Sequence, residues 1–164
     1  GADADPFMSG LPVRAQALAE VADLHARVAG RRLAFGIGSL HDFEPEHLAR
    51  EGLGDLPLLR ELGFDVEVVI QERDRPEVHA RIRRDLAAFG CDVPYRLFYE
   101  PGVLAPVLRE GRFDAAVLAD FLGDQARAAG VPMVRFGAFG SGYAGTIEAC
   151  RLVRQVLLAR GGAG

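Results

Sequence analysis

The sequence contains no lysine, and its 19 basic residues are all arginine. The chain therefore has no lysine for Schiff-base chemistry or for the phosphate-binding loop of P-loop proteins. Its 23 acidic residues give a net charge of −4, which argues against a nucleic-acid-binding surface. No apolar run approaches the ~20 residues that span a bilayer, and no signal-peptide pattern opens the sequence. We therefore expect a cytoplasmic protein without nucleic-acid or membrane partners.

Cysteine is scarce as well. The two cysteines, Cys91 and Cys150, lie far apart and show no Cys-x-x-Cys spacing. They cannot supply the four ligands of a typical iron–sulfur or structural zinc site, so we expect no cofactor bound by this chain alone. Their number suggests a reducing compartment. Cys150 falls on the apolar stripe of the last predicted helix and is expected to be buried, whereas the place of Cys91 after a helix-ending glycine is compatible with exposure.

Apolar runs that alternate with amphipathic segments indicate an α/β fold. Strands are predicted at 33–38, 66–71, 95–99, 115–119 and 132–136, and helices at about 13–29, 44–51, 55–62, 74–90, 101–111, 123–129 and 143–160. Strands that are apolar on both faces form a parallel sheet covered on both sides. Right-handed crossovers then give a doubly wound three-layer sandwich with a five-stranded parallel sheet, Rossmann-like or flavodoxin-like. Residues 1–12 are expected to be a tail or linker, and residues 13–161 a single α/β domain.

Glycine is abundant, with 20 residues, and the glycines that follow predicted strands indicate where a ligand could bind. In doubly wound sheets, ligands bind beyond the carboxyl ends of the strands. Three of these ends are followed by residues 38–47, 119–124 and 135–146. The pair Gly36 and Gly38 lacks the third glycine of a dinucleotide-binding fingerprint, because His41 stands in its place. We interpret this pair as glycines that let the strand end turn tightly.

Possible metal ligands are densest in the loop HDFEPEH at 41–47. Its two histidines and three carboxylates could hold a divalent ion. The alternative, which we favour, is that the acidic residues complement a helix N-terminus and both histidines are solvated, so no metal ligand is assigned. His25 lies on the apolar face of the first predicted helix, and we expect it to be a hydrogen-bonded core histidine.

The strongest local signal is the segment GAFGSGYAGT at 137–146, which contains a GxGxxG pattern after a strand and at the start of a helix. Free backbone N–H groups and the positive end of the helix would suit an anion or the edge of a cofactor. A tight turn with close helix–sheet contact explains these glycines equally well. We do not expect a complete dinucleotide site, because no further strand with a ribose-binding acid follows.

The candidate cofactor-binding residues are Gly38, Ser39, His41, Arg135, Gly137, Gly140, Gly142, Tyr143 and Gly145. No catalytic residue is assigned. One interpretation joins the loop around His41 and the glycine turn in a single pocket. The chain would then be a stand-alone flavodoxin-like module that binds a small molecule or a nucleotide.

A second interpretation comes from five motifs that occur in the same order as in a known family. The stretch LPVRAQALAEVADLHARVAGRR (11–32) resembles the helix that introduces a domain of nitrogenase component 1 subunits, and the strand at 33–38 resembles that family's next strand. LLRELGFDV (58–66) and FDAAVL (113–118) are similar to its following helix and strands. GVPMVRFG (130–137), followed by GYAGT (142–146), is similar to a motif of its beta-type subunits and of the related cofactor-assembly scaffold.

The resemblance covers about residues 11–160 and implies a single domain, the C-terminal one of three, of a nitrogenase-like oxidoreductase component or of its metallocluster-assembly scaffold. It implies a share in a cofactor cleft and a subunit interface, an iron–sulfur or related cluster in the parent complex, and two partners, an alpha-type subunit and an ATP-dependent iron protein. The family holds its clusters mostly with cysteines of other domains. We therefore expect no redox or enzymatic activity from this chain alone.

The resemblance also suggests roles for two parts of the candidate site. Alpha-type subunits place a cofactor-ligating histidine just after the strand that corresponds to 132–136, where this sequence has Arg135, Phe136 and Gly137. Arg135 could offset the negative charge of a cluster, and the turn from Gly140 to Gly145 could donate N–H groups to cluster sulfides or to an organic ligand. The alternative for Arg135 is a surface or structural ion pair.

Overall fold

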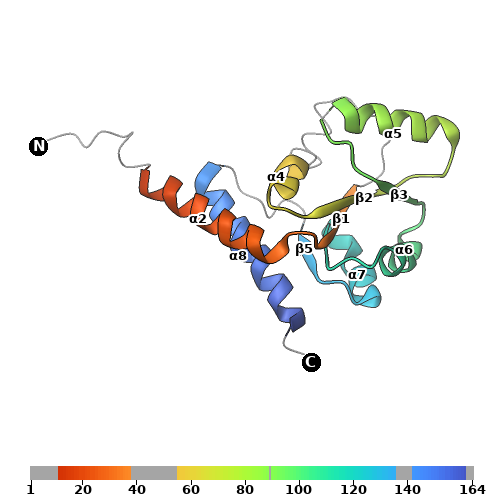
Figure 1. Ribbon diagram of the computed structural model, residues 1–164. Helices are drawn as coiled ribbons and strands as arrows, with labels where there is room; N and C mark the ends of the chain where they lie inside the picture. Colours follow the sequence, from red (N-terminus) through yellow and green to blue (C-terminus); the bar gives the residue numbers. More distant parts are fainter. Residues whose placement is uncertain (1–10, 38–54, 89, 136–141, 162–164) are drawn as a thin grey trace, which may run out of the picture.

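The sheet of this protein consists of five parallel strands in the order β3-β2-β1-β4-β5 (Figure 1). The computed structural model describes residues 11–37, 55–88, 90–135 and 142–161. The strands are β1 (Arg32–Ile37), β2 (Asp65–Gln71), β3 (Tyr95–Phe98), β4 (Ala115–Leu118) and β5 (Met133–Arg135). The helices are α2 (Leu11–Val28), α4 (Asp55–Glu61), α5 (Pro76–Ala88), α6 (Leu104–Gly111), α7 (Gly123–Ala129) and α8 (Gly142–Gly161), with short 3-10 helices η1 (Pro101–Val103) and η2 (Asp120–Leu122).

The predicted fold class is confirmed: the chain is a three-layer α/β sandwich with an all-parallel sheet. Each of the five strands lies within two residues of its predicted bounds. Of the two versions of this architecture named above, the strand order matches the first five strands of the Rossmann order 3-2-1-4-5-6. The helix predicted at 44–51 lies outside the described residues.

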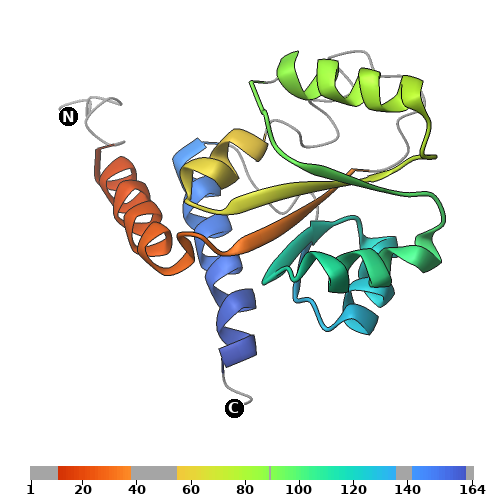
Figure 2. The same cartoon turned by 45° about the vertical axis from the view of Figure 1, so that its right-hand side comes forward.

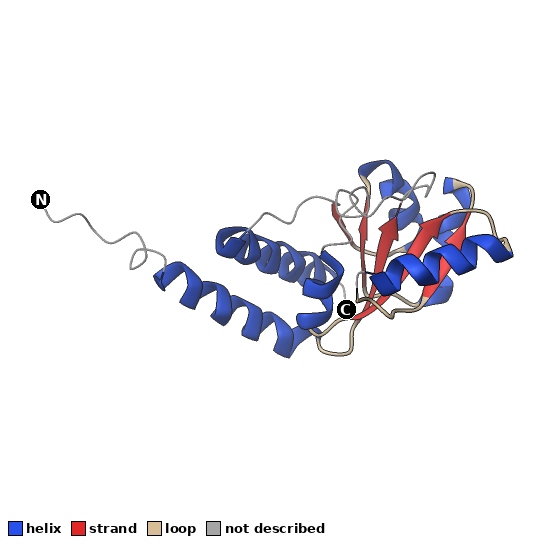
Figure 3. Cartoon of the chain, turned by 90° about the horizontal axis from the view of Figure 1, so that it is seen from above, coloured by secondary structure: helices blue, strands red, loops and turns tan. Residues whose placement is uncertain are grey.

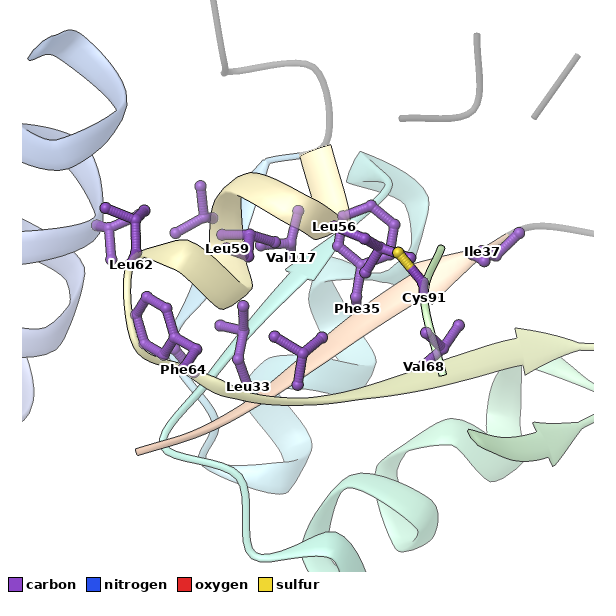
Figure 4. Packing of buried hydrophobic residues seen from close by; sticks show 14 of the residues in the cluster. Leu33, Phe35, Ile37, Leu56, Leu59, Leu62, Phe64, Val68, Cys91 and Val117 are labelled. Carbon is purple, nitrogen blue, oxygen red and sulfur yellow. The ribbon is translucent and has the colours of Figure 1, made fainter. Parts of the chain in front are cut away.

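Two separate apolar layers flank the sheet, because alternate residues of each strand point to opposite faces. One layer joins Leu33 and Phe35 of β1 to buried side chains of α4, α5 and α8 (Figure 4). The other joins Ala34 of β1 to buried side chains of α6 and α7. Figures 1 and 2 show α4 and α5 on one side of the sheet and α6 and α7 on the other. Both faces of the central strands are therefore covered, as the apolar runs predicted.

The helices α2 and α8 pack along each other next to the sheet (Figure 3). Ion pairs join them: Arg151 Nε lies 3.0 Å from Glu20 Oε1, and Arg154 Nη1 lies 3.0 Å from Asp23 Oδ2 and 3.3 Å from Glu20 Oε2. These groups are partly solvated, so each pair contributes modestly to stability, on the order of 0–1 kcal/mol. Burial of Leu24 and Val28 of α2 against the main core is the larger contribution.

A buried carboxylate joins three neighbouring strands on the α6 face of the sheet. Glu67 of β2 is 5% exposed and lies between Arg32 of β1 and Arg96 of β3, each with a nitrogen 2.5 Å from a Glu67 oxygen. Arg32 also donates to the carbonyl of Gly111, and its guanidinium lies 5.1 Å from the ring centroid of Phe113. Both arginines remain partly exposed. The buried carboxylate of Glu67 is therefore paired without the desolvation cost of two fully buried cations.

The interpretation of Gly36 as a turn residue is wrong. Gly36 lies within β1, where it is paired in register with Val69 of β2, and it is buried. A Cβ at this position would lie 2.4 Å from Cδ2 of Leu118 on the adjacent strand β4. Gly36 is therefore required because the Leu118 side chain occupies the space that a methyl group would need.

We predict that Gly36→Ala destabilises the protein by roughly 1–3 kcal/mol, because the added methyl group overpacks a core in which Leu118 is fully buried. Gly102→Ala is the matched control, since a Cβ there meets nothing within 4 Å. Urea unfolding monitored by circular dichroism measures both variants. In the double variant Gly36→Ala/Leu118→Val, the smaller valine side chain makes room for the added methyl group. Its loss of stability should therefore be smaller than the sum of the losses in the two single variants. Equal stability of the two glycine variants would contradict the packing argument.

Candidate functional site

The carboxyl ends of the parallel strands lie at one edge of the sheet, here called the carboxyl edge. From β1 the chain crosses to β2 on one side, and from β4 it crosses to β5 on the other side. The neighbouring strands β1 and β4 thus form the topological switch point, beyond which ligands bind in doubly wound sheets. Among the described residues, Ala119, Asp120 and Phe121 follow β4, and Gly142 and the helix α8 follow β5.

The structure describes four of the nine candidate cofactor-binding residues: Arg135, Gly142, Tyr143 and Gly145. The other candidates, Gly38, Ser39, His41, Gly137 and Gly140, lie outside the described residues. The His41–His47 loop that was considered as a metal site lies outside them as well. The assignment of the nine residues to a cofactor site stays a prediction, because the geometry of the four described residues does not test it.

Arg135 is the last residue of β5 and forms an ion pair across the carboxyl edge. Its Nε lies 3.4 Å from Oδ1 of Asp120, the first residue of η2 after β4. Both side chains are well exposed, at 75% for Arg135 and 69% for Asp120. An ion pair this exposed is weak, so Arg135 can exchange Asp120 for another negative group at little cost. Sequence reasoning did not single out Asp120, because only the pairing of β4 with β5 brings it to Arg135.

The start of α8 depends on one glycine of the predicted GxGxxG pattern. Gly142 has φ +70°, a left-handed conformation that favours glycine. Its carbonyl accepts a hydrogen bond of 3.0 Å from Oγ1 of Thr146, so that hydroxyl is used within the helix. Tyr143 is 52% exposed, whereas Gly145 is buried. The ion pairs of Arg151 with Glu20 and of Arg154 with Asp23 place this start of α8 alongside the N-terminal half of α2 (Figure 1).

Exposed apolar side chains gather in the segments that follow the strands. Among the described residues, six large apolar side chains are exposed; Tyr99, Val103, Phe121 and Tyr143 come after β3, β4 or β5, and Val13 and Leu18 lie on α2. Exposed aromatic side chains next to an arginine are typical of interfaces and ligand sites. The carboxyl edge therefore has a surface that suits contact with another molecule or domain.

Both cysteines are buried in the core layer between the sheet and the α4, α5 and α8 helices. This confirms the prediction for Cys150 and excludes exposure of Cys91 (Figure 4). Burial raises the pKa of both thiols; the nearby Arg60 partly offsets the effect at Cys91, and Glu20 adds to it at Cys150. A buried, protonated thiol is a poor nucleophile and a poor metal ligand.

The described residues do not fit an iron–sulfur cluster. Within them, no group of three or more histidine, cysteine, aspartate or glutamate side chains could hold a metal ion. Cys91 follows α5 and Cys150 lies within α8, and each is enclosed by apolar side chains. No step of a cluster reaction is therefore assigned to these side chains.

His25 differs from its expected role. It is exposed on α2, and Cδ2 of its ring would lie 3.0 Å from a Cβ added at Gly63. Gly63 has φ +93° and follows α4, so the imidazole covers a glycine turn and does not enter the core. The prediction followed the stripe through Leu18 and Ala22, which are exposed, whereas the buried face of α2 consists of Ala17, Leu24 and Val28.

A polar pocket that sequence reasoning missed lies beside the carboxyl ends of β2 and β3. Its volume is about 340 Å³, and Glu72, Asp74, His79, Tyr95 and Tyr99 are among its lining residues. His79 bridges two of them: its Nε2 lies 2.8 Å from Oδ1 of Asp74 and its Nδ1 lies 2.7 Å from the Tyr95 hydroxyl. No sequence spacing predicts this cluster, because the register of β3 against β2 brings Tyr95 to α5.

Comparisons with known proteins identify a similar fold. No family model and no curated protein matches the sequence. A solved structure described as "Nitrogenase Cp1 at pH 6.5" is similar, with a TM-score of 0.60 and 18% sequence identity. The match covers 93% of this chain and 34% of that chain, so this chain spans about a third of its length. At this identity the likeness shows the fold alone, which is nitrogenase-like.

The search for membrane-spanning helices gave none: among the described residues, no helix combines the length and the apolar character needed to cross a bilayer.

We predict that both cysteines of the folded full chain react slowly with a thiol reagent at pH 8, and react completely after unfolding in urea. Because burial raises their folded-state pKa above the ordinary value of 9.0, the unfolded chain ionises first as the pH rises. The cysteine contribution to stability is thus full below pH 9 and is lost above it. As the pH rises through this range, the urea midpoint should fall less in Cys91→Ala/Cys150→Ala than in the wild type, because the variant has no thiols to ionise. Rapid labelling of the folded chain at pH 8 would show that a thiol is accessible.

Proposed function

We propose that this chain is a domain of a nitrogenase-like oxidoreductase component, or of the scaffold on which a metallocluster is assembled. Its carboxyl edge forms part of a cofactor cleft and of a subunit interface. The observation that carries the proposal is the structural match over 93% of this chain to about a third of a nitrogenase chain. The motif resemblance over residues 11–160 supports the same family and, within the proposal, a position of the domain at the C-terminal end of a subunit.

The chemistry of the carboxyl edge supports the role in a cleft or interface. Arg135 is solvated and forms an ion pair with the exposed carboxylate of Asp120. Phe121 and Tyr143 are exposed in segments that follow β4 and β5. Aromatic and arginine side chains supply much of the binding energy in protein interfaces. In the proposal, Phe121 and Tyr143 contact a partner, and Arg135 exchanges Asp120 for a negative group of the partner or of its cofactor.

The described side chains supply no cluster ligands, because both cysteines are buried and protonated. In the proposed complex, the iron–sulfur or related cluster is therefore held by other domains. The chain alone is not redox-competent. Its proposed partners in the cytoplasm are an alpha-type subunit and an ATP-dependent iron protein.

The full chain, tagged and produced in the organism that encodes it, tests this proposal. We expect it to be isolated with nitrogenase-like chains and iron, and to be colourless when purified alone. Arg135→Ala should weaken the complex about tenfold, because arginine side chains are frequent hot spots. Arg127→Ala is the matched control, since Arg127 is 82% exposed and pairs with Asp124 on α7. Mass spectrometry and affinity measurements on the isolated complex give these results.

Two outcomes would contradict this proposal. Recovery of the chain without any nitrogenase-like chain would exclude the domain assignment. A brown purified chain with cysteine-bound iron would overturn the claim that cluster ligands come from elsewhere. Equal losses of affinity in Arg135→Ala and Arg127→Ala would show that the carboxyl edge is not part of the interface. The domain assignment would not be affected by that result.

A further inference from the structure

The pocket beside β2 and β3 contains a hydrogen-bonded chain of three side chains from separate segments. Asp74 lies in the turn after β2, His79 in the first turns of α5, and Tyr95 at the start of β3. An ionised carboxylate only accepts hydrogen bonds, so the imidazole N–H that faces Asp74 is at Nε2. Nδ1 of the neutral ring then accepts the hydrogen of the Tyr95 hydroxyl. The Tyr95 oxygen keeps its lone pairs for another donor.

The acidic groups of the pocket add further acceptors. The carboxylate of Glu72 is 8% exposed, and its oxygens accept from Nη2 of Arg81 at 3.0 Å and from the backbone N–H of Arg73 at 3.1 Å. Neither arginine is among the pocket-lining residues. Asp74 is 83% exposed and uses Oδ1 for His79, which leaves Oδ2 accessible. Oδ2 of Asp74 and the hydroxyl oxygen of Tyr95 can therefore each accept a hydrogen bond from a ligand. The Tyr95 hydroxyl hydrogen is already donated to His79, and the Asp74 carboxylate has no hydrogen to donate.

The remaining wall of the pocket is apolar and partly aromatic. Leu97, Tyr99 and Val103 line it, and Tyr99 is 50% exposed. The guanidinium of Arg73 lies 4.2 Å from the Tyr99 ring centroid and donates to its hydroxyl at 2.7 Å, which fixes the ring. A volume of about 340 Å³ is within the range of small-molecule pockets, roughly 300–1,000 Å³. A planar ring fits such a wall better than a flexible or spherical group.

We propose that this pocket binds a planar small molecule that carries hydroxyl or amino donors and no negative charge, of which a nucleoside is the representative. The ring packs on Leu97, Tyr99 and Val103, and the donors face Asp74 and Tyr95. The charge of Glu72 is balanced by its ion pair with Arg81, whereas Asp74 presents an exposed carboxylate; a phosphate group next to Asp74 therefore weakens binding. This site is separate from the proposed carboxyl-edge interface at β4 and β5, and it goes beyond the proposed function.

Titration of the full chain with adenosine tests the proposal, and adenosine 5′-monophosphate is the charged counter-probe. The chain has three tyrosines and no tryptophan, and two of the tyrosines, Tyr95 and Tyr99, line the pocket. Tyrosine fluorescence therefore reports binding at this place, and isothermal titration calorimetry gives the affinity. We expect adenosine to bind with a dissociation constant below the millimolar range and the monophosphate to bind more weakly.

Two variants locate the site. Asp74→Asn replaces the outer acceptor oxygen by a donor, and Tyr95→Phe removes the hydroxyl; each should weaken adenosine binding about tenfold, as expected for a hydrogen bond to a buried or charged acceptor. The matched control is Asp124→Asn, because Asp124 is 84% exposed, pairs with Arg127 on α7 and is not among the pocket-lining residues. It should bind adenosine as the wild type does. Circular dichroism confirms that each variant is folded.

The proposal is overturned if adenosine does not bind at millimolar concentration, or if the monophosphate binds as tightly. It is also overturned if Asp124→Asn loses as much affinity as Asp74→Asn. None of these outcomes bears on the nitrogenase-like complex, because the Arg135→Ala comparison concerns the ends of β4 and β5, whereas this pocket lies at the ends of β2 and β3. Failure of that complex to form would likewise leave the adenosine titration valid.

Discussion

The pairing of β1 on both of its sides is the constraint from which the rest of the structure follows. All six residues of β1 are in register with β2, and its residues Leu33, Ala34 and Phe35 are also paired with β4. A strand in this position is buried on both faces and needs helices above and below it. The crossovers that provide those helices leave in opposite directions, which creates the switch point. Arg135 and Phe121 lie near this point because the strands that carry or precede them are ordered outward from β1.

The sequence was sufficient to predict the layers of the fold, but it did not show which side chains of neighbouring strands are in contact. Largely apolar runs of five or six residues that alternate with helical stripes predicted all five strands, because such runs are the signature of doubly covered strands. The role of Glu67 could not be predicted, because only the pairing of β2 with β1 and β3 brings Arg32 and Arg96 beside it. The partner of Arg135 and the cluster around His79 depend in the same way on which strands are neighbours. His25 was misjudged because the apolar spacing of α2 did not show which of its faces is buried, and Cys91 because its place after Gly90 did not show that it packs into the core.

The two polar regions of the carboxyl edge differ in how firmly their groups are held. Asp120 and Arg135 form one exposed ion pair between η2 and the end of β5. Around His79, each polar group has a specific partner, and Arg73 additionally fixes the ring of Tyr99. The first arrangement can be rebuilt around a large partner, whereas the second is a preformed site with a fixed pattern of acceptors. A single parallel sheet can carry both because each pair of strand ends opens into its own loops.

The buried Glu67 has a consequence for how β2 finds its place in the sheet. The residues of β2 around it are Val66, Val68, Val69 and Ile70, so both faces of the strand are apolar and side-chain shape alone distinguishes them poorly. A shift of β2 by one residue would turn Glu67 to the opposite face, among the side chains of α4 and α5, and would leave Arg32 and Arg96 without their carboxylate. An unpaired carboxylate in that layer would be strongly unfavourable. Glu67, the one acidic residue among these apolar side chains, thus makes the native register of β2 more favourable than a register shifted by one residue.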